Sequence, residues 1–128
     1  MVNAENHGLL DLFEQECQGH LDAMRACLPA LYSATGAAPA AAAAAIADSL
    51  HTLAGAARSI ELTDLEYLCR ALERLVQARN GAAWDADSIA PLDAALTLAP
   101  QLLAAPSGRV RNQAMALAAR CDAAGAQP

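Results

Sequence analysis

The sequence predicts an all-α protein, an antiparallel four-helix bundle with an appended C-terminal helix. Alanine and leucine dominate the composition, whereas valine and isoleucine are scarce and aromatic residues make up only 3% of the chain, a balance that favours packed helices over sheets. Apolar residues recur at helical spacing in segments separated by short stretches with glycine and proline. For 128 residues we expect one helical domain over 1–128, with its core over about 5–104 and the last helix over about 107–124.

An apolar stripe in the N-terminal part of the chain predicts the first helix. The stripe consists of Leu9, Leu12, Phe13, Cys17, Leu21, Met24, Leu28 and Leu31. Pro29 is expected to kink this helix or to begin its end, because proline lacks the backbone N–H that a helix interior uses. The stretch from Ser33 to Pro39, which contains Gly36, is typical of a loop.

The next two helices are predicted to form a hairpin. The alanine tract at 40–45 is expected to open the second helix, since alanine is the best helix former. The inner face of this helix consists of Ile46, Leu50, Leu53, Ala57 and Ile60. The capping-box pattern at 63–66, Thr-Asp-Leu-Glu, predicts the start of the third helix, which should end near Asn80 and Gly81. Its inner face consists of Leu65, Leu68, Leu72, Leu75 and Val76.

Two further helices are predicted in the C-terminal part. The fourth should run from Asp87 to about Ala104, a range that contains two prolines. The fifth should begin after Ser107 and end before Gly125. Because the connections between consecutive helices are short, neighbouring helices of the bundle should be antiparallel.

The charge of the chain argues against nucleic acid as a partner. The formal net charge is −6, and no lysine is present, so all 8 basic side chains are arginines. Nucleic acid attracts basic surfaces through its phosphates. The positive charge that exists is concentrated in the predicted hairpin, which contains Arg58, Arg70, Arg74 and Arg79.

The lengths of the apolar segments and the spacing of the cysteines argue against a membrane protein and against a metal-binding protein. No apolar run approaches the roughly 18 to 20 charge-free residues that a membrane span needs, so we expect no membrane partner. The cysteines, Cys17, Cys27, Cys69 and Cys121, lack the paired spacing of a zinc site, and Cys17 with His20 supplies only two ligands. We therefore expect no metal, no cofactor and reduced thiols in a cytoplasmic protein.

One histidine and one glutamate are predicted to face each other across the hairpin. With the turn centred near Leu62, His51 and Glu73 are each 11 residues away and should lie at the same height, about 16 Å above the turn. Each is one position from an inward leucine, so the pair belongs at the water-accessible edge of the helix interface. A nucleophilic imidazole needs one free ring nitrogen and one that holds the proton, and a carboxylate beside the second nitrogen fixes that tautomer.

The residues around this histidine also form a linear motif. His51 is followed by Leu53 and Gly55, then by an apolar helix, a turn and a second helix with Glu73. Over 50–76 this pattern resembles the signature of a histidine-containing phosphotransfer (HPt) domain. The family has a lysine where this chain has Ala54.

Two further segments bear on the resemblance. The stretch from Leu9 to Glu16 is similar to the first helix of the phosphotransfer module in chemotaxis-type histidine kinases. Glu61 lies in the turn, where many members of the family have glycine, and it could reshape the turn without touching the site.

The resemblance implies a place in a two-component phosphorelay. His51 would accept a phosphoryl group and pass it to or from the aspartate of a response-regulator receiver domain, with a histidine kinase as the other partner. Glu73 would orient the imidazole. Because the chain contains no Gly-rich phosphate loop and no kinase motif, we expect a phosphoryl carrier and not an independent enzyme.

The resemblance also indicates which residues would meet the phosphate or the partner. Gly55 would leave room for the partner backbone, which would explain a residue that costs roughly 1 kcal/mol against alanine in a helix. Ala54 marks the place of the missing lysine. Arg70, at the same height as Ala54 across the hairpin, could supply a cation there, with Arg58 and Arg74 on the same helical hairpin.

Other interpretations stay open at this point. A phosphotransfer-like domain that has lost phosphorylation could act only as a binding or scaffolding module, and Ala54 supports this alternative. Glu73 could simply pair with Arg70 or Gln77 at helical spacing. The arginines could form a solvated face, and Gly55 could permit close helix packing. A purely structural helical domain is the third possibility.

Overall fold

The computed structural model describes residues 4–32, 36–79, 84–103 and 107–126. Within these ranges the chain forms five helices and no strand. The helices are α1 (Ala4–Leu31), α2 (Ala38–Ser59), α3 (Thr63–Ala78), α4 (Ala86–Leu103) and α5 (Gly108–Ala126). The predicted all-α fold with an additional C-terminal helix is confirmed. In this part of the chain no helix combines the length and the apolar character that crossing a bilayer requires.

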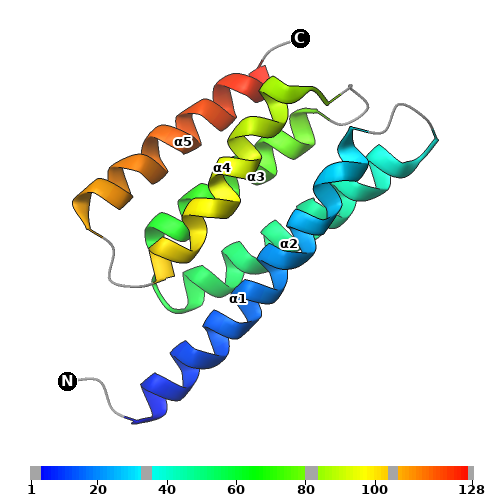
Figure 1. Cartoon of the computed structure of the whole chain (residues 1–128). Coiled ribbons are helices and arrows are strands. Elements are labelled where there is room, and N and C mark those ends of the chain that lie inside the picture. Colours follow the sequence, from blue (N-terminus) through cyan, green and yellow to red (C-terminus); the bar gives the residue numbers. More distant parts are fainter. Residues whose placement is uncertain (1–3, 33–35, 80–83, 104–106, 127–128) are drawn as a thin grey trace.

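The first four helices form the bundle, and α5 covers one side of it (Figure 1). α2 packs between α1 and α3, while α4 contacts both α1 and α3 and so closes the bundle. α5 lies against α3 and α4. Two ion pairs, Asp64 with Arg111 and Arg74 with Asp122, join the starts and the ends of α3 and α5, so these two helices run parallel.

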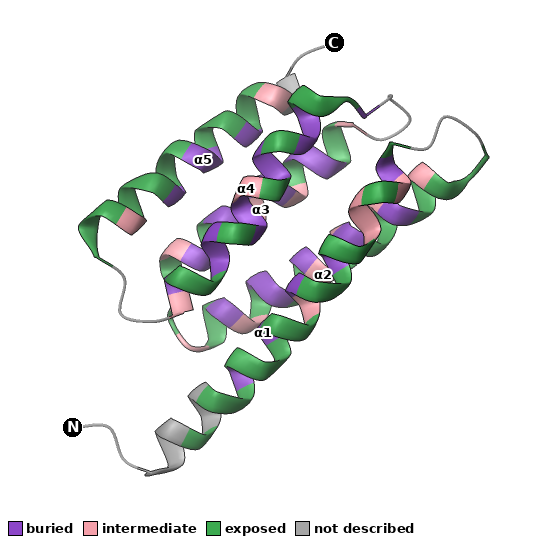
Figure 2. Cartoon of the chain, in the orientation of Figure 1, coloured by how far each residue is buried: buried purple, intermediate pink, exposed green. Residues whose placement is uncertain are grey.

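Buried residues lie on the inward faces of the helices (Figure 2). Most of them are leucine or small residues. The largest fully buried side chains in α1 to α4 include Met24, Leu31, Ile46, Leu50, Leu53, Leu65, Leu68, Leu75, Leu92 and Leu102. α5 adds Ala114, Leu117, Ala118 and Cys121. These small and medium-sized residues let the helices pack closely, as the composition predicts.

The apolar stripe of α1 departs from the prediction at one position. Phe13 is buried, but Leu12 is 52% exposed, because it lies about 100° around the helix from its buried neighbour. Leu9 belongs to the predicted stripe, but its side chain lies outside the described residues. The N-terminal turns of α1 extend beyond the other helices (Figure 1), and the helix includes Pro29 and ends at Leu31.

α2 begins earlier than the predicted loop allowed. Its first residue is Ala38, so the alanine tract is helical, as predicted. Pro39 lies in the first turn of the helix and not in a loop. Proline is well tolerated there, because the first N–H groups of a helix have no intrahelical acceptor.

The turn between α2 and α3 closes by backbone hydrogen bonds. The N–H of Leu62 donates to the carbonyl of Ala57 at 2.9 Å, and that of Glu61 donates to Arg58 at 3.2 Å, which is the Schellman pattern of a helix C-terminus. Glu61 has φ 62°, the left-handed conformation that glycine usually supplies at this place. The predicted capping box is wrong, because Leu62 is the N-cap residue, makes no side-chain cap, and leaves Thr63 as the first residue of α3.

The remaining helix ends lie close to the predicted ones. α3 ends at Ala78, and the predicted stop at 80–81 lies outside the described residues, as does the predicted end of α4 at residue 104. α4 begins one residue before the predicted Asp87, and α5 continues to Ala126, past its predicted end. Asp85 caps α4 by accepting the N–H of Ser88 at 2.8 Å, and this hydrogen bond, with that of the Ser88 hydroxyl, lowers the pKa of Asp85.

Candidate functional site

The α2–α3 hairpin places His51 opposite Glu73 at the edge of the helix interface. The leucines that precede the two residues, Leu50 and Leu72, are buried between the helices. A rotation of one position therefore brings His51 and Glu73 to the rim. The His51 side chain is 71% exposed, whereas the Glu73 side chain is only 15% exposed, so a largely buried carboxylate supports an exposed ring.

The two side chains make a direct contact. His51 Nδ1 lies 3.2 Å from Glu73 Oε2. An ionised carboxylate can only accept a hydrogen bond, so this contact favours the tautomer in which Nδ1 carries the proton and donates it. The other ring nitrogen, Nε2, then keeps its lone pair. The geometry expected from counting residues around the turn is thus present.

Arg70 is the third member of this cluster. Its Nη1 donates to Glu73 Oε1 at 3.2 Å and lies 3.4 Å from His51 Nδ1. Its Nε is 4.0 Å from Oε2 of Glu66, one turn earlier in α3. The sequence singled out Arg70 as a cation and left its pairing with Glu73 open, but it did not predict the approach of Arg70 to His51 Nδ1. Glu66 was missed, although its position four residues before Arg70 is a spacing at which helical ion pairs form.

Gly55 leaves an open patch one turn after His51. The residue is exposed, and a Cβ added to it would meet no atom within 4 Å outside its own helix backbone and chain neighbours. The alternative that Gly55 permits close helix packing is therefore wrong. The open surface agrees with the interpretation that a partner approaches at this point.

Ala54 does not reach the surface. Its exposed fraction is 0%, so its side chain cannot touch phosphate or a partner, and we correct its place among the predicted contact residues. Arg58 is exposed in the last turn of α2, where a cation interacts favourably with the helix dipole.

Arg74 is occupied elsewhere. It makes a two-pronged ion pair with Asp122 of α5, with N–O distances of 3.0 and 3.2 Å. The hydrogen bond that Arg74 donates to Asp122 and the negative charge of that carboxylate raise the pKa of Arg74. The role of Arg74 in phosphate or partner binding stays a prediction, and in this structure its side chain pairs with Asp122 of α5.

The cysteines form no cluster with other potential metal ligands. Among the described residues, no three histidine, cysteine, aspartate or glutamate side chains are grouped as a metal site would require. Burial raises the pKa of Cys17 and Cys121 to about 11 and that of Cys69 to about 12. These thiols stay protonated near neutral pH and contribute to packing.

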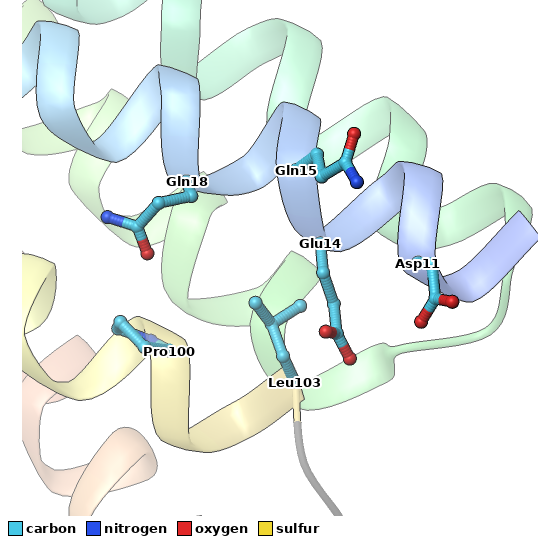
Figure 3. Close-up of a pocket in the computed structure, with 6 residues that line it drawn as sticks. All are labelled: Asp11, Glu14, Gln15, Gln18, Pro100 and Leu103. Carbon is cyan, nitrogen blue, oxygen red and sulfur yellow. The ribbon is translucent and has the colours of Figure 1, made fainter.

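A hollow between α1 and α4 does not include the histidine (Figure 3). Its lining consists of Asp11, Glu14, Gln15, Gln18, Pro100 and Leu103. Figure 3 shows the Glu14 side chain extending toward Leu103, across the space between the helices. None of these residues is a candidate from the sequence, and His51 itself stands on an open surface. An exposed nucleophile of this kind suits group transfer between two proteins.

Comparison with known proteins agrees with this geometry. A model of the Hpt domain family matches residues 8–120, which is most of the chain. No curated protein and no solved structure gives a significant match. Hpt domains transfer phosphoryl groups through histidine in two-component relays, together with kinases and receiver domains. Both the family match and the helical bundle that presents His51 lead to the same conclusion: the chain belongs to the Hpt domain family.

Proposed function

We propose that this Hpt domain is a phosphoryl carrier and that its acceptor atom is Nε2 of His51. The observation that carries the proposal is the 3.2 Å contact between His51 Nδ1 and Glu73 in a side chain that is 71% exposed. One ring nitrogen is held by an acceptor, and the other faces solvent with a lone pair.

The chemistry follows from this division of the ring. The Nε2 lone pair attacks phosphorus in line, a P–N bond forms, and the bond from phosphorus to the aspartate oxygen of a phosphorylated receiver breaks, which leaves that aspartate as a carboxylate. The ring keeps its Nδ1 proton and becomes cationic, and the Glu73 carboxylate stabilises this charge. Transfer from His51 to a second receiver reverses these steps, so that the P–N bond breaks and a bond from phosphorus to the aspartate oxygen forms. When a histidine kinase phosphorylates the chain from ATP, Nε2 is again the acceptor, and the bond that breaks is the one from the γ-phosphorus to the oxygen of the departing ADP.

Arg70 and Arg58 are the cations that we assign to the incoming phosphoryl group. Both lie on the hairpin that carries His51, and the contact of Arg70 with the ring is to Nδ1, at 3.4 Å. Guanidinium groups bind phosphate oxygens well because they offer several N–H donors in a fixed plane. Gly55 is assigned to partner docking on the strength of its open surroundings.

A binding or scaffolding module is the second candidate. Its support is Ala54, which lacks the cationic group of the family and is fully buried. Such a module would use the same exposed face around Gly55 but would not need a nucleophile at His51. Replacing His51 would then have little effect, while bulky residues at Gly55 would matter.

The setting in the cell is also part of the proposal. We infer a cytoplasmic single domain that works with a receiver and a kinase of the same organism. The similarity of the first helix to chemotaxis-type kinases suggests that such a kinase system is the source of the phosphoryl group.

A transfer assay tests the proposal. The chain is incubated with ATP-labelled histidine kinases and receivers from the same genome, and acid-labile label on the chain is measured. We expect label on the wild type and none on His51→Gln. His20→Gln, which changes another histidine on a helix, is the matched control and should keep its label. A receiver that binds the wild type without any label on the chain would favour the scaffolding module.

A further inference from the structure

The contacts of Arg70 lie on the side of the ring that does not react. Its Nη1 is 3.2 Å from Glu73 Oε1 and 3.4 Å from His51 Nδ1, while no contact of this residue to Nε2 is found within the described structure. Oε2 of Glu66 lies 4.0 Å from its Nε. The cation thus has two carboxylates of its own helix as neighbours.

The 3.4 Å approach of Arg70 to Nδ1 is compatible with two protonation patterns. If Nδ1 carries the proton, it donates to Glu73, and Arg70 can donate only to the carboxylate. If Nδ1 is bare, it accepts from Arg70, and the proton resides on Nε2, which then has no lone pair for attack. Glu73 and Arg70 therefore favour opposite tautomers when each acts on the ring directly.

The distances favour the first pattern. The carboxylate is nearer to Nδ1 than the guanidinium is, at 3.2 against 3.4 Å, and a carboxylate cannot donate. Arg70 also has a charged acceptor of its own in Glu73 Oε1, and a hydrogen bond between two ionised groups is stronger than one to a neutral ring nitrogen. One carboxylate thus receives the guanidinium on one oxygen and the imidazole on the other.

We propose that Arg70 is a positioning residue that locks the Glu73 carboxylate so that Oε2 faces His51 Nδ1 and the nucleophilic tautomer predominates. This inference rests on the proposed function, since it concerns how the acceptor ring is prepared. It gives Arg70 a task before any phosphoryl group arrives.

In this chain the cation beside the ring comes from α3. Position 54, which is level with Arg70 when residues are counted from the turn, holds a fully buried alanine and contributes no charged group. Arg70 reaches Glu73 from three residues away on the same helix, so the contact needs no element to move. The Arg70 guanidinium therefore holds the Glu73 carboxylate through its Oε1 oxygen.

Nitrogen NMR of the free protein tests the proposal. The full chain is labelled with ¹⁵N-histidine, His51 is assigned by comparison with His51→Gln, and the pH is raised until its ring shifts no longer change, so that the ring is neutral. We expect one proton-bearing shift at Nδ1 and one lone-pair shift at Nε2. In Arg70→Ala the two shifts should converge as the ring exchanges between tautomers, and Arg70→Lys should restore part of the difference.

The same NMR spectrum provides a control and shows which results would overturn the proposal. Arg74→Ala removes an arginine of the same helix that pairs with α5 and should leave the His51 shifts unchanged. Unchanged shifts in Arg70→Ala, a larger Nδ1-proton fraction in that variant, or a wild-type ring protonated at Nε2 would each overturn the proposal. The measurement needs no kinase or receiver, so its failure is distinguishable from failure of the transfer assay.

Discussion

The His51 imidazole meets two requirements that are difficult to combine in one side chain. Its Nδ1 is held at 3.2 Å by a mostly buried carboxylate, yet the side chain is 71% exposed. The ring is therefore oriented without being enclosed. A carrier that reacts only inside a complex needs little more, because the partner can supply the electrostatic stabilisation of the transferred group.

A substitution at Gly55 should affect the stability of the fold and the binding of a receiver in opposite directions. Gly55→Leu is expected to raise the free energy of unfolding by roughly 0.5 to 1 kcal/mol, because leucine is the better helix former and the new side chain meets open space. The same change should weaken binding of a cognate receiver by about tenfold or more, through a bulky side chain one turn from His51. Urea unfolding and titration calorimetry measure the two effects.

Gly19 supplies the matched control for this prediction. It is an exposed helical glycine of α1 with equally open surroundings. Gly19→Leu should stabilise the fold to a similar extent and leave receiver binding unchanged. Equal receiver affinity for Gly55→Leu and the wild type would rule out docking at this face.

The pair His51 and Glu73 could be predicted because residue counting around a short antiparallel turn fixes height, and neighbouring leucines fix direction. The sequence offered Arg70 and Gln77 as partners of Glu73 and could not decide between them, because both lie at helical spacing. The ion pair of Arg74 was missed, since its partner Asp122 lies on a helix 48 residues away. The burial of Ala54 could have been predicted, because it lies four residues after Leu50 and three before Ala57 on the inner face.

At the scale of elements, the α2–α3 turn shows a local conflict between sequence and conformation. Glu61 adopts φ 62° at the position of a Schellman motif where glycine is favoured. Glu61→Gly should raise the free energy of unfolding by roughly 0.5 to 1 kcal/mol, since the left-handed conformation costs an L-residue about 1 kcal/mol or more and part of that gain is offset by the greater freedom of glycine in the unfolded chain. Urea unfolding measures the change.

The gain at this turn should be specific to glycine. Glu61→Ala retains the Cβ and is expected to leave stability nearly unchanged, because the Glu61 side chain is exposed. A loss of stability in Glu61→Gly would contradict the assignment of strain to this residue.

The ion pair between Arg74 of α3 and Asp122 of α5 indicates a structural role for Arg74, and we expect this residue to take no part in phosphoryl transfer. Arg74 and Asp122 are about half exposed, so a double-mutant cycle with Arg74→Ala and Asp122→Ala should give a coupling of at most about 1 kcal/mol that weakens as salt is added. Phosphoryl transfer should be unaffected in both variants. Slower transfer in Arg74→Ala but not in Asp122→Ala would show instead that Arg74 meets the partner.

The order and type of the helices were predictable, whereas their ends were less so. Apolar periodicity located all five helices, because each buries one continuous face. Thr63 matched a capping box, but Leu62 is the N-cap residue and α3 begins without a side-chain cap. The cap formed by Asp85 and Ser88 was missed, although aspartate is a favoured N-cap residue.

At the scale of the whole molecule, composition determined the fold class more firmly than any motif. Alanine and leucine supply both helix propensity and a core that small side chains can fill, and the structure uses them on the inward faces of all the described helices. α5 extends this core over α3 and α4 through Leu117 and three small side chains. The presence of α5 could be predicted from a fifth periodic segment in the sequence, but its parallel alignment with α3 could not be predicted.

The buried thiols predict how global stability depends on pH. Cys17 and Cys121 have a pKa of about 11 and Cys69 of about 12, against 9.0 for an exposed thiol. At a pH between 9.0 and the raised pKa values, the thiols of the native state are still protonated, whereas those of the unfolded chain have lost their protons. The free energy of unfolding should therefore fall as pH rises above about 9. Urea unfolding under reducing conditions, at about pH 8 and about pH 10.5, measures this loss.

Cysteine variants identify the source of that dependence. Cys69→Ala removes the thiol with the largest rise in pKa and should reduce the loss of stability at high pH. Stability that does not change over this range would contradict the account of the thiols.

The measurement that tests the central claim most directly is the location of the phosphoryl group on the labelled ring. The ¹⁵N-histidine chain is phosphorylated by its kinase or by a small phosphoryl donor, and ³¹P and ¹⁵N NMR identify the bonded nitrogen. The account predicts phosphorus on Nε2 of His51, with Nδ1 still protonated and facing Glu73. A phosphoryl group on Nδ1, or on His20 with His51 unmodified, would contradict it.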